Sequence, residues 1–487
     1  MNRTPPYSAR FRDLWQLHVL YRRRGDDAAA TDLLERAAAV ALAYLGSSDD
    51  ERLVLRRQEE VNHVIAELAW MYAKAGDPVR ALAATEAARA MTVRLYTMSR
   101  EERLHWAQQS LASVAPRPVV RVEDGEARFT LAREPEPLSE ELRLPDISAQ
   151  LGRLRTRLAD APTAIVSLAG TPGRGLTAII CYPDGTLTSV QWALERSVPS
   201  PAEGFDAPDL SREGRFRELS EEFYEPFFGP VDRALRNRGV SRVVLSAPFW
   251  LGRFPMEALR NGSPYVADDY EIVYVPSIGV AADLPRARTE RHRERMLIVG
   301  YAGTDLPGTR AEVSGLQDIW GDRATVVSAA DCTKEHILTE LGGQYDIIHF
   351  CCHASHDPEY PLASALHLVP EAKDDRHKLA AWEIMQLVRF ARAPVVSLSA
   401  CSSGVMDGSD TNNCYGLTGS FLRAGARLIV ASRWPVYDNL ARQTVLAMYG
   451  NYDNGLSLPR SLREASAAMR RSWEIEDWAA FGCVGLP

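Results

Sequence analysis

The sequence contains no apolar run that approaches the roughly 18 residues of a membrane-spanning helix, and no apolar segment follows its first six residues. A membrane-spanning protein and a protein exported by a signal peptide are therefore not expected. Cysteine is sparse as well: the seven cysteines are odd in number and form no Cys-x-x-Cys pair. These features argue against a disulfide framework and favour a reducing compartment, so we expect a cytoplasmic protein.

Lysine is also rare. Only four of the 56 basic residues are lysine, a skew typical of a GC-rich genome rather than of a function. Acidic residues outnumber basic ones by 64 to 56, which gives a formal charge of −8 and a pI near 5.8. A generally basic nucleic-acid binder is thereby excluded, and nucleic acid is not an expected partner. The 487 residues predict about three domains, which need no metal or disulfide to fold.

Residues 11–110 show helical periodicity and contain no segment typical of a strand. Residues 21–27 are echoed by residues 72–78, each with an aromatic side chain, a short gap and Gly-Asp before an alanine-rich helix. Glycine supplies the turn and alanine lets paired helices approach closely, so this region resembles tetratricopeptide-like helical hairpins. An unrelated pair of helical hairpins is the alternative, since an independent solenoid usually needs three repeats.

Residues 111–162 are rich in proline and charge, and they predict a linker with one short helix near residues 147–158. From residue 163 onward, strand-like apolar runs alternate with helical patterns such as those over 222–238 and 331–341. The apolar runs cover residues 163–169, 176–182, 240–246, 296–300, 347–352, 395–398 and 427–431. This alternation predicts an α/β domain with a mostly parallel central sheet, preceded by an all-helical module.

The loop over residues 170–175 is rich in glycine but does not predict a phosphate-binding site. It lacks the Gly-Lys-Ser/Thr ending, and an apolar run follows it where a helix would be required. We therefore predict a β-hairpin joining residues 163–169 to residues 176–182. The sequence contains no Walker-type loop, which argues against a nucleotide-binding signalling ATPase, and no cofactor is expected.

Two apolar runs end near residues that carry chemistry: residues 347–352 lead to His353, and residues 395–398 lead to Cys401. Catalytic groups collect at the carboxyl ends of parallel strands, so adjacent strands would bring both side chains to one edge. Because a thiolate is a nucleophile and an imidazole takes its proton, these residues predict a catalytic dyad. The N–H groups of Ala354 and Cys401 are the candidate oxyanion donors. A core cysteine and a polar strand end are the alternatives, but a spacing of 48 residues is typical of caspase-like peptidases.

His349, Cys351 and His353 alternate along one strand, and all three are residue types that bind metals. Three such positions span roughly 13 Å along a strand. This distance is too long for one zinc ion with bonds of about 2 Å. No metal site is therefore expected.

Residues 163–487 resemble a CHAT domain, the caspase-like peptidase domain associated with tetratricopeptide repeats and related to separase. The matching motifs are Pro248 with Phe254-Pro255-Met256-Glu257-Ala258-Leu259, Ile348-His349-Phe350 with His353, Ser399-Ala400-Cys401 with Gly404, Trp434-Pro435-Val436 with Asp438, and Trp478 with Phe481. The resemblance implies a caspase-like domain over 163–487, with 163–290 as its non-catalytic half and 291–487 as its catalytic half. A helical repeat module over 1–110 and a linker over 111–162 would precede it.

The resemblance further implies that His353 is the general base and Cys401 the nucleophile of a peptide-bond hydrolase. In separases a similar tryptophan motif supplies an acid that receives a basic P1 side chain, which makes Asp438 the candidate S1 residue. The alternative is that Asp438 caps the helix that follows it. Two residues depart from the family pattern. Ala354 replaces a glycine and would be strained at positive φ, and Arg433 replaces an apolar residue.

Together these features predict a cytoplasmic cysteine endopeptidase that cleaves a specific protein and binds a regulatory protein through its helical repeats. Related CHAT peptidases act in bacterial defence and programmed cell death. This resemblance implies a defence effector, such as a gasdermin-like pore former, as the substrate. No direct membrane contact is expected. The alternative is an inactive caspase-like scaffold, against which the intact pair of His353 and Cys401 argues.

Overall fold

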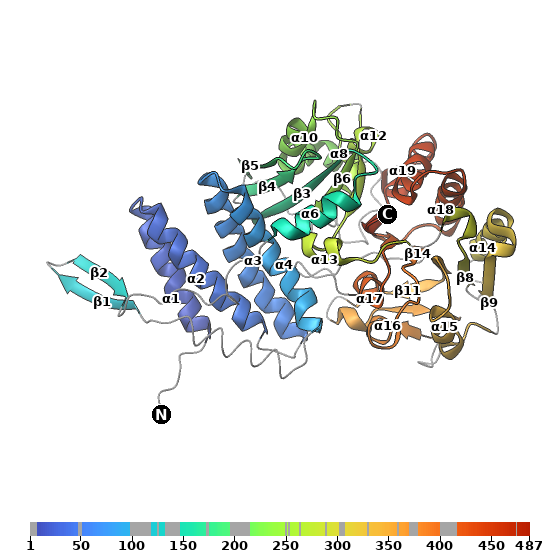
Figure 1. The fold of residues 1–487 in the computed structure, drawn as a ribbon, viewed down its shortest axis with the longest axis horizontal. Helices are drawn as coiled ribbons and strands as arrows, with labels where there is room; N and C mark the ends of the chain where they lie inside the picture. Colours follow the sequence, from blue (N-terminus) through green and yellow to red (C-terminus); the bar gives the residue numbers. More distant parts are fainter. Residues whose placement is uncertain are drawn as a thin grey trace.

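The structure of the chain is a computed structural model, shown in Figure 1. It describes the chain except for residues 1–6, 47–50, 98–117, 124–125, 132–146, 172–174, 195–214, 249–250, 252–253, 263, 288–289, 301–306, 329–330, 358–359, 370–377, 400–415 and 474. Helices come first along the chain and a large sheet domain follows, in the order that the sequence predicted.

The N-terminal module is built from the helices α1 (Tyr7–Arg23), α2 (Asp27–Gly46), α3 (Glu51–Lys74) and α4 (Pro78–Thr97). Each helix packs against the next one along the chain. Small side chains fill the module's interior, among them the fully buried Ala30, Ala37, Ala69, Ala81 and Ala84. Alanine at these positions lets the helices approach closely, as the sequence pattern indicated.

The turns between α1 and α2 and between α3 and α4 have the same geometry. Gly25 and Gly76 adopt φ angles of 79° and 77°, which glycine reaches without strain. Asp26 and Asp77 each accept a hydrogen bond at 3.0 Å from the backbone N–H three residues later. Each aspartate therefore caps the second helix of its hairpin. The repeat read from the sequence is confirmed at the level of individual hydrogen bonds.

The region between the helices and the large sheet contains the helix α6 (Ser148–Arg157) and a hairpin of β1 (Pro118–Glu123) and β2 (Glu126–Leu131). The helix agrees with the one predicted near residues 147–158. The hairpin was not predicted, because the proline-rich and charged composition of the whole region outweighed the short strand pattern within it.

One mixed sheet organises the rest of the described chain, with the strand order β5-β4-β3-β6-β7-β16-β15-β14-β10-β8-β9. Its strands are β3 (Thr163–Thr171), β4 (Gly175–Cys181), β5 (Leu187–Ala193), β6 (Arg242–Ser246), β7 (Glu271–Tyr274), β8 (Met296–Gly300), β9 (Ala324–Ser328), β10 (Ile347–Cys351), β14 (Val395–Ser399), β15 (Leu428–Ser432) and β16 (Phe481–Gly485). All neighbouring pairs are parallel except β3–β4, β4–β5 and β15–β16. The predicted mostly parallel sheet and the predicted β3–β4 hairpin are both confirmed.

Helices cover the faces of this sheet (Figure 1). None of the helices that the structure describes has both the length and the apolar composition of a membrane span. The helices beyond α6 are α8 (Arg215–Glu222), α9 (Tyr224–Phe227), α10 (Gly229–Leu235), α12 (Val266–Asp269), α13 (Ile278–Asp283), α14 (Pro307–Trp320), α15 (Lys334–Leu341), α16 (Ala381–Leu387), α17 (Gly416–Ala424), α18 (Asp438–Asp453), α19 (Leu458–Met469) and α20 (Ile475–Trp478). A second, small sheet consists of β11 (His353–Ser355), β12 (Ala365–His367) and β13 (Lys378–Ala380).

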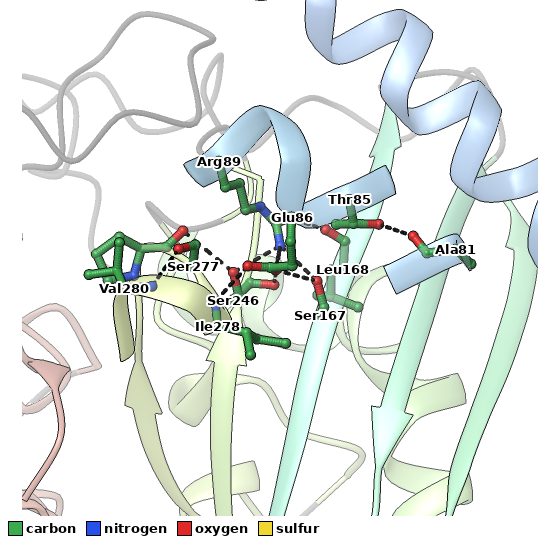
Figure 2. Close-up of polar contacts among 11 residues, drawn as sticks. Ala81, Thr85, Glu86, Arg89, Ser167, Leu168, Ser246, Ser277, Ile278 and Val280 are labelled. Carbon is green, nitrogen blue, oxygen red and sulfur yellow. Dashed lines mark hydrogen bonds and ion pairs between the residues drawn. The ribbon is translucent and has the colours of Figure 1, made fainter. Parts of the chain in front are cut away.

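The helical module is joined to the sheet by a buried polar network, shown in Figure 2. α3 and α4 pack against β3, β4 and β5, and α4 carries Glu86 and Arg89, which are 1% and 2% exposed. The Arg89 guanidinium donates to the hydroxyls of Ser167 on β3 and Ser246 on β6, both at 2.8 Å, and to the carbonyl of Leu168.

The Glu86 carboxylate completes this network. It accepts the N–H of Ile278 at 2.6 Å and the hydroxyl of Ser167 at 3.1 Å, and Arg89 lies 3.4 Å away. Burial raises the pKa of Glu86, and the attraction of Arg89 opposes that shift. A paired charge held by this many hydrogen bonds fixes α4 to two strands and to the start of α13. The module is therefore packed into the sheet domain rather than attached to it by a linker alone.

Candidate active site

The two strands predicted to carry the dyad are neighbours in the large sheet. β10 and β14 run parallel, and their register pairs Cys351 with Ser399, the last residue of each strand. The N–H of Cys352 donates to the carbonyl of Ser399 at 3.4 Å, which holds the two ends together. The carboxyl ends of both apolar runs therefore lie side by side, as the pattern of the sequence predicted.

His353 begins β11, two residues after the end of β10. It is half-buried and pairs in register with His367 on the antiparallel strand β12. The His367 imidazole lies 2.9 Å from the hydroxyl of Ser355. Burial, together with the charges of Lys378 and His353, lowers the pKa of His367. His353 thus stands where the central sheet gives way to the small one, at the edge predicted for catalysis.

Ala354 follows His353 in β11 and pairs in register with Leu366. Among the described residues other than glycine, Asn237 alone has a positive φ, so Ala354 has ordinary strand geometry. The strain that alanine would suffer at positive φ does not arise here. Replacement of the family's glycine by alanine is therefore compatible with this backbone.

Cys401 lies outside the described residues, as do all residues from 400 to 415. Its distance from His353 and the role of its N–H in an oxyanion hole therefore stay predictions. The described cysteines are all buried: Cys181, Cys332, Cys351, Cys352 and Cys483. Burial raises the pKa of Cys332 to about 12 and that of Cys351 well above its usual range. Buried thiols do not meet a substrate, so none of these five is a candidate nucleophile.

Asp438 is the first residue of α18, and Tyr437 holds the N-cap position before it. The Asp438 carboxylate accepts a hydrogen bond from the N–H of Gly308, near the start of α14. The carboxylate therefore bonds to α14 rather than to the backbone of α18, the helix that Asp438 begins. The role of Asp438 in an S1 pocket stays a prediction.

Glu312 on α14 is a buried residue that the sequence gave no reason to single out. Its carboxylate lies 2.8 Å from His349 Nε2, and the Cys351 thiol and the Ser399 hydroxyl donate to it at 3.1 and 3.2 Å. The ligand atoms of Glu312, His349 and Cys351 lie within 4.8 Å of one another, so this is the described set that could hold a metal ion. The set considered from the sequence alone was His349, Cys351 and His353. In the structure, Glu312 takes the place of His353 in that set.

Arg433, the second departure from the family pattern, is a partly buried residue with several partners. It donates to the Glu257 carboxylate at 2.8 Å and to the carbonyls of Ala479 and Phe481 at 3.0 and 3.1 Å. Its guanidinium also lies 5.1 Å from the centre of the Tyr274 ring. Arginine at this position therefore joins the end of β15 to β7 and β16, a role that an apolar side chain does not fill.

A cavity of about 610 Å³ lies away from this edge, between the helical module and the β3–β4 hairpin. Its walls include Trp15, Arg22, Trp70, Gly170 and Gly175. Of the predicted site residues that the structure describes, His353, Ala354 and Asp438, none lines it. The cavity is therefore separate from the strand edge where His353 lies.

Residues 217–486 match the family model of the CHAT domain, which is more than half of the chain. The chain therefore belongs to the CHAT domain family. Tetratricopeptide repeat protein 28 of Mus musculus is 24% identical over 215 residues, and its Homo sapiens counterpart is 24% identical over 213 residues. Each alignment covers 37% of this chain and 8% of the relative, so the chain spans a small part of these curated proteins.

The crystal structure of the Saccharomyces cerevisiae separase–securin complex resembles the whole chain. The TM-score is 0.57 at 11% identity, and the match covers 99% of this chain and 40% of the other. At this identity the likeness shows the fold alone. The predicted architecture, a helical module followed by a separase-like, caspase-like domain, is confirmed.

Proposed function

We propose that this protein is a cysteine endopeptidase in which Cys401 is the nucleophile and His353 the general base. The observation that carries the proposal is the register of β10 and β14, whose last residues pair and are each followed two positions later by a member of the dyad. Membership of the CHAT family supports the same activity.

In this mechanism the Cys401 thiolate attacks the scissile carbonyl carbon, and His353 holds the proton that the thiol has lost. His353 delivers that proton to the leaving amine, and water then hydrolyses the thioester that remains. The N–H groups of Ala354 and Cys401 stabilise the negative charge on the carbonyl oxygen. The unstrained strand geometry of Ala354 supports its part in this arrangement.

The proposal includes a basic P1 side chain that pairs with Asp438. A carboxylate has about four acceptor positions, so the single N–H of Gly308 leaves capacity for a guanidinium or ammonium group. The same N–H fixes the orientation of the carboxylate at the start of α18.

The substrate in this proposal is a specific protein of the cytoplasm, and the helical repeats bind the protein that regulates its cleavage. The buried network between α4 and the sheet supports this coupling, because it ties the repeats to the strands. We place the activity in bacterial defence or programmed cell death, with a gasdermin-like protein or another defence effector as the substrate.

Digestion of a peptide library with every residue type at P1 tests the proposal, with the wild type and the Cys401→Ala variant in parallel. Cleavage after arginine or lysine is expected from the wild type and not from the variant. Asp438→Asn is expected to lower kcat/KM for these peptides by at least about 30-fold, because a desolvated charge pair contributes about 2 kcal/mol or more. Asp453→Asn, at the other end of α18, is the control and should leave kcat/KM unchanged.

Three results would overturn parts of this account. Cleavage that persists in Cys401→Ala would remove the proposed nucleophile. Absence of cleavage by both proteins, in the presence of the regulatory partner, would favour an inactive scaffold. Cleavage after apolar residues would leave the peptidase standing and remove Asp438 from its S1 pocket.

A further inference from the structure

The Glu312 carboxylate connects the two strands that lead to the proposed dyad. Its Oε1 atom lies 2.8 Å from His349 Nε2 and accepts the Cys351 thiol at 3.1 Å, so both of these contacts are to β10. Its Oε2 atom accepts the Ser399 hydroxyl at 3.2 Å, so this contact is to β14. The two oxygens of one side chain therefore bridge two neighbouring strands.

The bridge lies at the carboxyl edge of the sheet. Cys351 and Ser399 are the last residues of their strands and pair in register. His353 follows Cys351 by two residues, and Cys401 follows Ser399 by two residues. A shift of either strand end relative to the other would therefore change the distance between the imidazole and the thiolate.

The bridge is also buried and tightly packed. Glu312 and Cys351 are each 1% exposed, and His349 is fully buried beneath the Tyr449 ring, which meets it edge to face at 5.7 Å. The helix that carries Glu312, α14, packs against β8, β9, β10 and α18. Burial raises the pKa of the Cys351 thiol, so Cys351 keeps its proton and stays a hydrogen-bond donor. Water does not compete with these bonds, which strengthens each of them.

We propose that Glu312 is a positioning residue that fixes the separation of His353 and Cys401 by clamping the ends of β10 and β14 together. This inference rests on the proposed function and adds to it a residue that contacts neither the substrate nor the dyad. Misplacement of reacting groups by about 1 Å costs about 10²-fold in rate, so a clamp of this kind acts on kcat rather than on substrate binding.

Four variants of the full chain separate the clamp from general stability. Glu312→Leu removes the contacts to both strands, and Ser399→Ala removes only the contact to β14. Glu312→Gln keeps the shape of the side chain and a contact to each strand. Its amide oxygen can accept from β10, and its amide nitrogen can donate to the Ser399 hydroxyl oxygen on β14. Ser397→Ala is the matched control, since Ser397 is a buried serine on the same strand, paired in register with His349, without a bond to Glu312.

The measurements are kcat and KM on the best peptide of the library, and the rate of Cys401 alkylation by iodoacetamide between pH 5 and pH 9. We expect kcat to fall about 10²-fold in Glu312→Leu and about 10-fold in Ser399→Ala, with KM changed by no more than about 2-fold. Glu312→Gln should stay within about 3-fold of the wild type, and Ser397→Ala within about 2-fold. The midpoint of the alkylation profile should rise in Glu312→Leu and Ser399→Ala only, because a thiolate farther from its imidazole is less stabilised.

Wild-type kcat and an unchanged alkylation profile in folded Ser399→Ala, together with activity that depends on Cys401, would overturn the clamp and leave the peptidase intact. A loss of kcat in Glu312→Gln equal to that in Glu312→Leu would also overturn it. If the wild type neither cleaves peptides nor shows fast alkylation of Cys401, the proposed function itself fails, and the clamp fails with it. If the wild type needs a partner for activity and cleaves no peptide, the alkylation profiles decide the inference. A midpoint that does not rise in Glu312→Leu and Ser399→Ala would then overturn the clamp.

Discussion

Replacing Arg89 by methionine is expected to lower the free energy of unfolding by about 3–5 kcal/mol. The guanidinium is fully buried between α4 and the sheet, where it bonds Ser167, Leu168 and Ser246. Methionine has a similar length but no donor, so the Glu86 carboxylate would remain buried without its cation. Urea unfolding followed by circular dichroism and by tryptophan fluorescence measures the change, provided that the two transitions coincide.

The control for this prediction is Arg80→Met on the same helix. Arg80 pairs with Asp77 at the surface, with 65% of its side chain exposed, so its loss should cost less than about 1 kcal/mol. A double variant, Glu86→Leu with Arg89→Met, should lose less than the sum of the two single changes, because no uncompensated charge remains. An Arg89→Met protein as stable as Arg80→Met would show that the network does not hold the module to the sheet.

Replacing His353 by alanine is expected to lower kcat/KM for peptide cleavage by about 10³-fold, the usual effect of removing a general acid and base. The variant should keep its fold, because His353 is half-buried at the start of a three-residue strand. His367→Ala is the matched control, since His367 faces His353 across the β11–β12 pair. It should change kcat/KM by no more than a few-fold. Equal losses in both variants would mean that the small sheet, rather than His353, had been damaged.

The central strands β10 and β14 are among the elements that the sequence predicted best, whereas β7, which also lies inside the sheet, was missed. β10 and β14 are buried along nearly their whole length. A strand that is covered on both faces has a nearly continuous apolar sequence, which is easy to recognise. The edge strands β5 and β9 were missed because they are only partly buried and contain polar residues, such as Gln191 in β5 and Thr325 in β9. The predicted helix over residues 222–238 is divided into α9 and α10. Pro230 explains the division, since proline fits only the first turn of a helix.

The polar contacts that organise the site, and those that join the helical module to the sheet, could not be predicted from the sequence. Arg433 pairs with Glu257 across 176 positions, Arg89 bonds Ser246 across 157, and Glu312 contacts His349 across 37. Periodicity reports which face of an element is buried, but it does not report which distant side chain lies opposite. Arg433 therefore looked like a departure from a family pattern. The strand spacing argued only against one ion bound by His349, Cys351 and His353 together, and it gave no reason to expect that the His349 and Cys351 side chains lie 3.1 Å apart beside Glu312.

The most direct test of the central claim is the reactivity of Cys401. The full-length wild type and the His353→Ala variant would be treated with limiting iodoacetamide at pH 7, and the modified cysteine would be located by peptide mass mapping. We predict a single fast adduct on Cys401 in the wild type, formed about 10-fold or more faster than on free cysteine and slowed in His353→Ala. The buried Cys181, Cys332, Cys351, Cys352 and Cys483 should stay unmodified. Modification of Cys401 at the rate of free cysteine, with no effect of His353→Ala, would contradict the catalytic dyad.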